Sequence, residues 1–489
     1  MMRFPLVRLI EALESANLLA GTRGKLPESV EGISDDSRKV VAGSLFVAVR
    51  GSILDGHDYL KAAEESGAAV AMVEDATRTT LPAIVVREGR KAAAVAAGAA
   101  YDDPSRELRM IGVTGTNGKS TTAGILRHLL DQPGSRSASI GTLGVLLGSE
   151  AEVVPGGAEL TTPGPVELQR VLRELVNRGA KTVAMEVSSH SLHQRRIDGL
   201  SFDAAVFTNL TRDHLDYHHT MDAYFEAKAR LMDYLKSDGA AAINVDDANW
   251  ASLPDSRKKI LFGEGRRAHV RATDVNFSLS GSEWLLNHGG QSLPVRLPLI
   301  GDVNVHNALG AVAVGLTVGL PLETLAAGLA NLPQVPGRLE VISQNPTILR
   351  DYAHTPDAIE RALAAIRPFT NGRIILVFGC GGDRDRGKRA EMGKAAVEGA
   401  DLVIITNDNP RTEDPEQILD DIESGMKSGR HERITKRKAA IQRALDDVHA
   451  GDVIVLAGKG HETYQIIGTT KLPFDEKLIV RELLAGTAA

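Results

Sequence analysis

Apolar and polar positions alternate along the chain in two different periods. The apolar run 109–115 precedes a helix-like stretch at 119–130, and the apolar run 181–187 precedes another helical stretch. Short β-branched runs separated by Ala/Leu/Glu/Lys-rich segments are typical of βαβ units. The pattern therefore predicts an α/β fold with largely parallel sheets and flanking helices.

The first residues, 1–21, are apolar but interrupted by Glu11 and Glu14. A secretory signal would not carry these charges in its apolar core, so the segment is interpreted as an amphipathic helix. None of the apolar runs reaches the roughly 18 residues of a membrane span. We expect a cytoplasmic protein without a membrane span.

Two polar stretches rich in turn-forming residues divide the chain, Tyr101–Arg109 and Asn331–Glu340. They predict three domains, at 1–105, 106–335 and 336–489. Each piece is long enough to bury a core of its own. We expect a smaller N-terminal α/β domain, a central domain with a phosphate-loop type of sheet, and a Rossmann-like C-terminal domain.

The composition narrows the classes of function. The net charge is −7, which gives no indication of nucleic-acid binding. Cys380 is the single cysteine, so the chain has no internal disulfide and no cysteine-based zinc site. We expect the protein to act as a monomer.

A glycine-rich turn joins the run ending near Thr114 to the helical stretch that starts at Lys119. Gly115 and Gly118 permit a tight turn whose N–H groups face phosphate oxygens, while Lys119 supplies charge and Ser120 a hydroxyl for Mg²⁺. The strict GxxxxGK[ST] spacing is not kept, and a turn that binds nothing is the alternative. The full order of strand, turn, Lys-Ser and helix favours a nucleotide site.

Further chemistry follows two other strands. Glu186 ends one apolar run, where a carboxylate can reach Mg²⁺, and Asp213 and His214 follow the next. Lys228 shares helical spacing with apolar residues, which has two interpretations. Either its stem is buried and its ammonium reaches water, or burial lowers its pKa so that the neutral amine can form a carbamate with CO₂.

Three apolar runs of the last domain end in charged loops: IILVFGCGGDR, LVIITNDNPR and DVIVLAGKGHE. In a parallel sheet such ends gather at one edge, where ligands bind. The pattern therefore predicts one pocket of mixed charge, formed by Arg384, Asp408, Asn409, Arg411, Gly458 and Glu462.

The motifs GVTGTNGKST, MEVSSH, FTNLTRDHLDYH, NVHNALGA, DYAHTPD and GKGHE occur in this order across nearly the whole chain. Together they resemble the Mur ligases, ATP-dependent enzymes that form amide bonds in peptidoglycan precursors. GCGGDRDRGKR and DNPR are similar to the members that add meso-diaminopimelate to UDP-N-acetylmuramoyl-L-alanyl-D-glutamate. The resemblance implies ATP as co-substrate and Mg²⁺ as cofactor.

The resemblance also implies roles for individual residues. ATP phosphates would contact Gly115, Thr116, Asn117, Gly118, Lys119, Ser120 and Thr121. Further nucleotide contacts would come from Asn304, Arg338 and Asp351. The catalytic residues would be Lys119, Glu186, His214 and Lys228, and the metal residues Ser120, Glu186, His214 and Lys228 as a carbamate. The UDP-substrate would contact Ser37, Ser52, Ile53, Leu54, Thr161, Thr162, Ser188, Gln194 and Arg196. Meso-diaminopimelate would contact Arg384, Asp408, Asn409, Pro410, Arg411, Gly458 and Glu462.

The implied reaction activates a D-glutamyl γ-carboxylate as an acyl phosphate, which the incoming amine then attacks. The nearest alternative is the same step with L-lysine, and a relative of folylpolyglutamate synthetase is less favoured because the segment 33–51 matches a uridine-binding pattern. From another class, a nucleotide-driven switch protein is considered, although an NKxD guanine motif is lacking. A dinucleotide fingerprint at VFGCGGDR is rejected because Arg384 replaces its last glycine.

Overall fold

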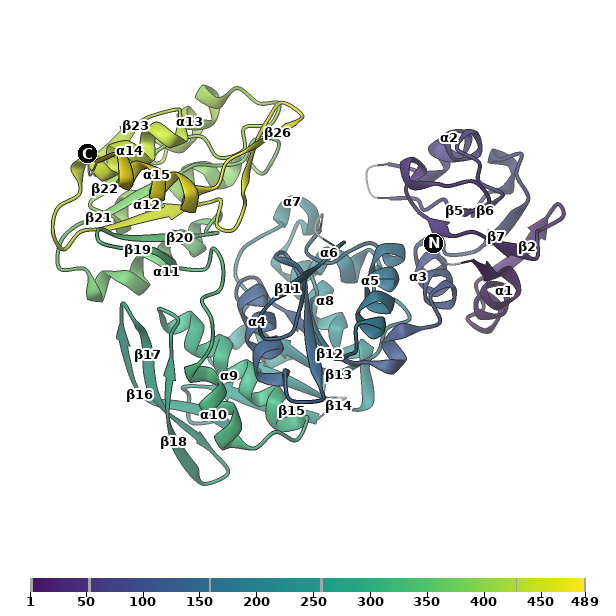
Figure 1. Ribbon diagram of the computed structural model, residues 1–489, viewed down its shortest axis with the longest axis horizontal. Helices are drawn as coiled ribbons and strands as arrows, with labels where there is room; N and C mark the ends of the chain where they lie inside the picture. Colours follow the sequence, from purple (N-terminus) through teal and green to yellow (C-terminus); the bar gives the residue numbers. More distant parts are fainter. Residues whose placement is uncertain (1–2, 52–53, 158–159, 256–257, 428, 488–489) are drawn as a thin grey trace.

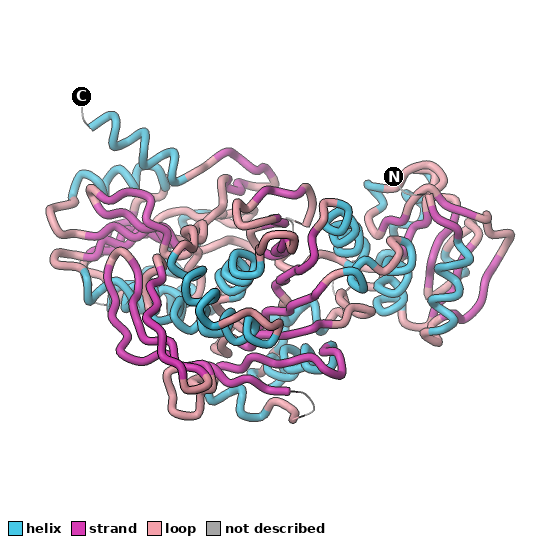
Figure 2. The backbone as a smooth tube through the Cα atoms, turned by 60° about the horizontal axis from the view of Figure 1, so that its bottom comes forward, coloured by secondary structure: helices cyan, strands magenta, loops and turns pink. Residues whose placement is uncertain are grey.

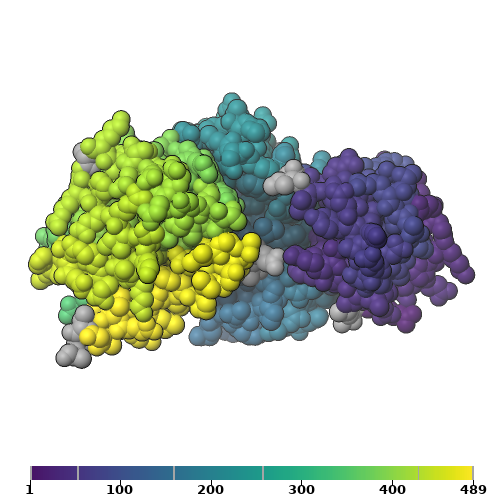
Figure 3. Space-filling view, turned by 90° about the horizontal axis from the view of Figure 1, so that it is seen from above, coloured from purple at the N-terminus to yellow at the C-terminus, as the bar shows by residue number. Residues whose placement is uncertain are grey.

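The computed structural model describes residues 3–51, 54–157, 160–255, 258–427 and 429–487. The chain forms three domains, and the N- and C-termini lie in different ones (Figure 1). Seen from above, the N-terminal domain and the C-terminal domain lie at opposite ends, with the central domain between them (Figure 3). Figure 2 shows the same arrangement from another side, with helices and strands mixed in each domain. The predicted three-domain α/β class is confirmed.

The N-terminal domain is built on a sheet with the order β2-β7-β6-β5-β4 among the described residues. Strands β4 to β7 are parallel and β2 is antiparallel to β7. The predicted first helix is present as α1, and it buries Leu6, Leu9 and Leu13. The elements are β1 (Phe4–Pro5), α1 (Leu6–Ser15), β2 (Leu19–Arg23), β3 (Ser29–Val30), β4 (Ile33–Ser34), β5 (Leu45–Val47), α2 (Leu60–Glu65), β6 (Val70–Val73), β7 (Ala83–Val86) and α3 (Gly89–Ala100).

The central domain carries a sheet with the order β11-β10-β9-β12-β8-β13-β14-β15-β16-β17-β18 in the described ranges. Its strands are β8 (Arg109–Thr114), β9 (Arg136–Gly141), β10 (Gly144–Leu147), β11 (Glu152–Val154), β12 (Ala180–Glu186), β13 (Phe202–Phe207), β14 (Leu235–Asn244), β15 (Lys258–Gly263), β16 (Val270–Ser278), β17 (Gly281–His288) and β18 (Gln291–Leu297). Its helices are α4 (Lys119–Leu130), α5 (Pro165–Asn177), α6 (Ser189–His193), α7 (Leu215–His218), α8 (Met221–Ala229), α9 (Asp302–Thr317) and α10 (Leu322–Ala330).

Side chains of β8 alternate between two cores. Ile111 and Val113 pack with residues of α4, α9 and α10 on one face, and Met110 packs with α5 and η5 (Arg230–Tyr234) on the other. Strands β9, β12, β8, β13, β14 and β15, adjacent in this order, run parallel to one another. The carboxyl ends of β8, β12 and β13 therefore meet at one edge, which is where the predicted nucleotide residues follow.

The C-terminal domain has a sheet with the order β19-β20-β24-β21-β22-β23 over the residues that the structure describes. All but β19 are parallel, as expected for a Rossmann-like domain. The strands are β19 (Glu340–Gln344), β20 (Thr347–Asp351), β21 (Ile374–Phe378), β22 (Leu402–Ile405), β23 (His431–Arg433), β24 (Val453–Ala457), β25 (Tyr464–Ile467) and β26 (Thr470–Pro473). The helices are α11 (Pro356–Ile366), α12 (Gly387–Gly399), α13 (Pro415–Glu423), α14 (Arg437–Asp447) and α15 (Glu476–Thr487).

The structure corrects the expected helix around Lys228 and decides between the two interpretations of its side chain. The helix carrying Lys228 ends at Ala229, so Met232 lies in the 3-10 turn η5 and Leu235 opens β14. Lys228 is nevertheless only 1% exposed, so its ammonium does not reach water and the first of the two interpretations is wrong.

None of the helices in the described ranges combines the length and the apolar character that crossing a bilayer requires.

Candidate active site

The phosphate-type loop lies between β8 and α4. Its two glycines have positive φ angles, 149° at Gly115 and 84° at Gly118. A side chain at Gly115 would collide with the Thr208 hydroxyl, and one at Gly118 with the Asn307 amide. Because these positions cannot carry a Cβ atom, the loop stays close to its neighbours and α4 begins directly at Lys119.

Two lysines converge on the loop. Lys119 Nζ donates to the carbonyls of Gly115 at 3.0 Å and Thr116 at 2.7 Å, and Lys228 Nζ donates to the Gly115 carbonyl at 2.7 Å. Burial lowers the pKa of both lysines, and for Lys228 the nearby Lys119 charge lowers it further. The Lys228 ammonium also lies 4.6 Å from the Tyr224 ring centroid. Lys228 therefore has the environment that favours a neutral amine.

The predicted carboxylate and imidazole groups face the same region. Glu186 accepts from the backbone N–H and the hydroxyl of Thr142, at 2.8 and 3.2 Å. His214 has a φ of 54°, and its Nε2 lies 3.4 Å from an Asp213 oxygen. Desolvation lowers the pKa of His214, with Asp213 partly offsetting it. The imidazole is therefore neutral and can offer a ring nitrogen to a cation.

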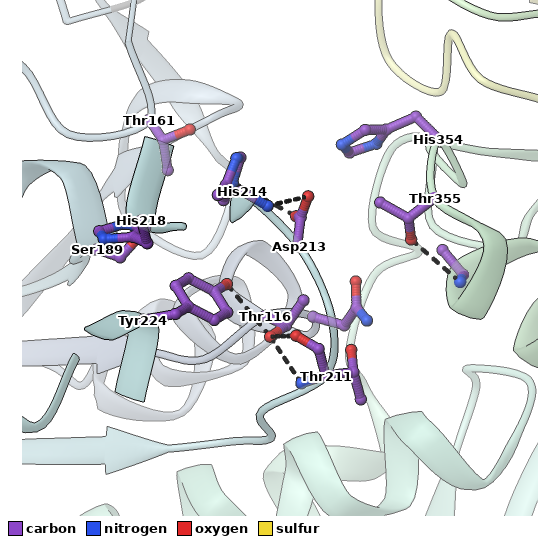
Figure 4. Close-up of polar contacts among 12 residues, drawn as sticks. Thr116, Thr161, Ser189, Thr211, Asp213, His214, His218, Tyr224, His354 and Thr355 are labelled. Carbon is purple, nitrogen blue, oxygen red and sulfur yellow. Dashed lines mark hydrogen bonds and ion pairs between the residues drawn. The ribbon is translucent and has the colours of Figure 1, made fainter. Parts of the chain in front are cut away.

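The C-terminal domain contacts this region directly. Arg338 donates to the Ser120 hydroxyl at 3.0 Å, and Asp357 accepts from Asn117 Nδ2 at 2.9 Å. Figure 4 shows His354 of this domain on the side of Asp213 and His214, whereas the Thr355 hydroxyl points to the backbone of α11, where it accepts from the Ala358 N–H. The central domain and the C-terminal domain thus both contribute polar groups to one site.

A cavity of about 360 Å³ adjoins the loop, between the central domain and α11. Its lining is formed by Thr208, Asn209, Leu210, Thr211, Asn244, Asp246, Asp247, Ala248, Asn249, Phe262, Asp302, Val303, His306, Asn307 and Arg361. The predicted Asn304 lies behind this lining, because its Nδ2 donates to the Ile300 carbonyl at 2.8 Å and its Oδ1 accepts from Asn307. The predicted Asp351 accepts from the Leu339 N–H at 2.7 Å, and burial raises its pKa.

A second polar group lies beside Glu186. The Thr162 hydroxyl donates to the Glu186 carbonyl at 2.8 Å and accepts from the Ser188 N–H at 3.1 Å. Arg196 donates to the Thr162 carbonyl at 3.0 Å and to Gln194 Oε1 at 2.6 and 3.0 Å. The Thr161 hydroxyl is 3.2 Å from that of Thr142. The structure thus brings all five predicted UDP-substrate residues of the central domain together.

The remaining predicted UDP-substrate residues belong to the N-terminal domain. Ser37 opens a short 3-10 turn (Ser37–Lys39) and is partly exposed, and Leu54 is 63% exposed. Ser52 and Ile53 lie outside the described residues. Asp35, two residues before Ser37, lies close to Gly164, because a Cβ atom added at Gly164 would be 3.4 Å from an Asp35 carboxylate oxygen. This segment of the first domain therefore approaches the start of α5. The first domain therefore faces the Thr162 group.

In the C-terminal domain, β24, β21 and β22 are adjacent and parallel, so their three loops meet as expected. Asn409 Nδ2 donates to Glu462 at 2.8 Å, and Arg411 donates to the Gly382 carbonyl at 2.7 Å. A Cβ atom at Gly458 would lie 2.6 Å from an Asp408 oxygen. Pro410 is buried in this cluster, and Arg384 is exposed at its border. Burial lowers the pKa of Arg411, and the nearby charge of Arg384 lowers it further.

Several residues of these sites were not predicted. Asp357 and Arg361, four residues apart on α11, reach the central domain or the cavity, and Lys459 lies fully buried among Asp408, Asn409 and Glu462. For Lys459 a signal was present in the sequence. It is the lysine of GKGHE, two residues after an apolar strand, although only the tertiary structure shows that its side chain points inward.

Comparisons with known proteins agree with this geometry. The Mur ligase family catalytic domain matches residues 29–112, the Mur ligase middle domain 113–315, and the Mur ligase glutamate ligase domain 337–460. The chain is 44% identical to the UDP-N-acetylmuramoyl-L-alanyl-D-glutamate--2,6-diaminopimelate ligase of Geobacter metallireducens, over 93% of this chain and 94% of that one. It is 42% identical to the ligase of the same name from Geobacillus kaustophilus, over 91% and 93%.

Solved structures give the same result. A UDP-N-acetylmuramoyl-L-alanyl-D-glutamate--2,6-diaminopimelate ligase is 34% identical with a TM-score of 0.65, covering 94% of this chain and 96% of that chain. The MurF ligase of Thermotoga maritima, solved in complex with ADP, is 20% identical with a TM-score of 0.66, covering 94% and 97%. At that identity the second likeness concerns the fold alone.

Proposed function

Because the chain belongs to the Mur ligase family, we propose that it joins meso-2,6-diaminopimelate to UDP-N-acetylmuramoyl-L-alanyl-D-glutamate, with ATP converted to ADP and phosphate. The observation that carries this proposal is the mixed-charge cluster of the C-terminal domain, with Arg411 and Glu462 at one sheet edge. It occurs in a chain 41–44% identical to relatives that bear this ligase name. The reaction belongs to peptidoglycan precursor synthesis.

The reaction needs two anions to meet, the substrate γ-carboxylate and the γ-phosphate of ATP. Lys119, on the loop, and Arg338, bonded to Ser120, supply positive charge from two domains. The carboxylate oxygen attacks the γ-phosphorus, ADP leaves, and the acyl phosphate remains. The amine then attacks the acyl carbon, loses a proton, and phosphate leaves. Catalysis consists mainly of positioning and charge stabilisation.

We further propose that Ser120, Glu186, His214 and Lys228 as a carbamate hold Mg²⁺. Within the described residues, no three His, Cys, Asp or Glu side chains converge enough to hold a metal by themselves. The proposed donors include the Ser120 hydroxyl and the Glu186 carboxylate. Such oxygen donors fit Mg²⁺, which is bound by one or two carboxylates together with substrate phosphates and water. When bound, the ion would neutralise developing phosphate charge.

The nucleotide would lie with its phosphates on residues 115–121 and its base toward the 360 Å³ cavity. Asn307 supports this placement, since it lines the cavity and also approaches the loop at Gly118. Asn304 would then act through Asn307, and Asp351 through the backbone of Leu339 beside Arg338. Because nucleotide groups come from both sides of the hinge near residue 336, closure of the C-terminal domain would complete the site.

The UDP-substrate would bridge the first two domains, from Ser37 and the loop 52–54 to Thr161, Thr162, Ser188, Gln194 and Arg196. We place the first domain boundary near residue 105, between β7 and β8, and the second near residue 335, between β18 and β19. We propose that the protein is a monomer in the cytoplasm. The free, buried thiol of Cys380 supports a reducing compartment.

An amino-acid panel tests the function. Purified protein, ATP, Mg²⁺ and the UDP-muramoyl dipeptide should release phosphate with meso-diaminopimelate and much less with L-lysine. Phosphate release that depends on both co-substrates separates a ligase from a nucleotide switch. Equal efficiency with L-lysine and meso-diaminopimelate would refute the assignment of the amino acid while leaving the ligase in place.

A further inference from the structure

Lys459 is a charged side chain with no contact to solvent. It follows β24 and is 0% exposed, and its ammonium lies 3.3 Å from Asp408 Oδ1, 3.1 Å from Asn409 Oδ1 and 3.1 Å from Glu462 Oε2. An ammonium has three N–H donors, so each of them has an acceptor here. Because a buried charge costs free energy unless it is paired, Lys459 depends on these three acceptors and holds them in place.

The contacts orient the groups around Lys459. Asn409 Oδ1 accepts from Lys459 and from the Ile466 N–H at 2.9 Å, so its Nδ2 must point to Glu462, to which it donates at 2.8 Å. In the described part of the chain, both side-chain bonds that Glu462 accepts end on Oε2. The carboxylate is therefore fixed by one oxygen, and the other oxygen, Oε1, remains for a ligand.

The charges around Lys459 add up to a simple balance. Asp408 and Glu462 carry two negative charges and Lys459 one positive charge, which leaves one net negative charge on this side of the pocket. Arg411 belongs to the same cluster, because the charges of Asp408 and Glu462 both act to raise its pKa against the effect of burial. The distal end of meso-diaminopimelate carries one ammonium and one carboxylate, so one net negative charge near a guanidinium matches it.

We propose that Lys459 is a positioning residue for amino-acid selection. Its ammonium neutralises Asp408 and holds Asn409 and Glu462, so that Glu462 presents one oriented anion to the distal ammonium of the substrate. The inference rests on the proposed function. It predicts that loss of the Lys459 charge raises the KM for meso-diaminopimelate. The KM values for ATP and the UDP-substrate should stay the same, because none of the residues proposed to bind them contacts Lys459.

The first test is Lys459→Met, which keeps the length and the apolar stem but removes the charge. We expect the KM for meso-diaminopimelate to rise at least about tenfold, because the charge-assisted bonds that orient Asn409 and Glu462 are lost. The KM values for ATP and UDP-substrate should stay within about twofold. Lys471→Met is the matched control, because Lys471 is an exposed lysine of the same domain, and it should change none of them.

A second test distinguishes positioning by charge from simple packing. In Lys459→Ala, added propylammonium matches the four missing side-chain atoms and should lower the KM for meso-diaminopimelate, whereas 1-propanol should not. Equal effects of the two compounds, an unchanged KM in Lys459→Met, or a C-terminal domain that stays unfolded in both variants with or without propylammonium would each overturn the proposal. If the wild type itself fails to use meso-diaminopimelate, the proposed function fails first.

Discussion

Arg411 shows how a single side chain is aimed by its backbone. Its φ angle is 52°, and its backbone N–H and C=O are both bonded to the β25–β26 hairpin, at Ile466 and Gly468. Because this left-handed conformation is costly for an arginine, the two bonds are what hold it. The guanidinium then lies beside Gly382, half-buried, with burial lowering its pKa.

We expect Arg411→Ala to lower kcat/KM for meso-diaminopimelate by about ten- to a hundredfold or more, because a charge-assisted hydrogen bond to the distal carboxylate is lost. The KM for ATP should change far less. Steady-state kinetics with each substrate varied in turn measures this. Arg367→Ala, which removes a partly exposed arginine paired with Asp401 in the same domain, serves as the control. A variant Arg411→Ala with normal kinetics would exclude a substrate contact.

Lys228→Ala should lose most activity, because the anionic carbamate that it is proposed to carry would be missing beside the phosphate loop. Millimolar short-chain carboxylates should restore part of the activity by occupying the space of the carbamate. The phosphate-release assay with and without acetate gives the answer. Lys236→Ala, which removes a lysine paired with Asp203 after the same helix, should stay active. Full activity of Lys228→Ala would end the carbamate proposal.

At the scale of elements, helices α14 and α15 hold two loops of the proposed amino-acid site. Arg437 of α14 and Glu476 of α15 form a salt bridge at 2.8 Å with both side chains 0% exposed. Arg437 also donates to the carbonyl of Ala457 at 2.8 Å, directly before Gly458, and lies 3.5 Å from that of Asn407, directly before Asp408. The last helix therefore stabilises the site without touching it.

Glu476→Gln should destabilise the C-terminal domain by about 3–5 kcal/mol, since it leaves the Arg437 charge buried without its partner. Hydrogen exchange at β22 and β24 amides measures the free energy of opening of this domain. The control is Glu482→Gln, which changes an exposed glutamate of α15 that pairs with Lys438 of α14. It should cost less than about 1 kcal/mol of stability. Equal exchange rates in the two variants would show that the buried pair is not important for stability.

At the scale of the whole molecule, the central domain connects the two regions that we propose bind the nucleotide and the UDP-substrate. Arg338 and Asp357 bring the C-terminal domain to the phosphate loop, through Ser120 and Asn117. On the other side, α3 packs against α5, and Val166 of α5 is part of the N-terminal core. The nucleotide and the UDP-substrate are thus proposed to use opposite sides of one sheet edge.

Lys119→Ala should abolish acyl-phosphate formation, because the lysine beside the γ-phosphate is lost. It should leave UDP-substrate binding almost unchanged, because the uridine contacts belong to the first domain. Trapping of the acyl phosphate by reduction, together with calorimetry of the UDP-substrate, tests both parts. Loss of UDP-substrate affinity in this variant would contradict the three-domain assignment.

The sequence by itself determined the features that depend on local spacing. Alternating strand and helix periods predicted parallel sheets, and turn-forming residues near 105 and 335 indicated where the chain divides. Strand ends followed by charged loops predicted that Asp408, Arg411 and Glu462 would meet, because parallel strands end at one edge. These inferences need only the periodicity of each element and the direction of neighbouring strands.

Only the tertiary structure decided what depends on distant packing. Burial settled the position of the Lys228 ammonium, which helical spacing had left open, and α8 ends earlier than that spacing suggested. Asn307 of α9 lines the cavity, whereas the Asn304 side chain turns away from it and donates to the Ile300 carbonyl. Lys459 was overlooked for the same reason. Whether a charged side chain points into a core is set by the loops packed around it, and these come from positions about fifty residues apart.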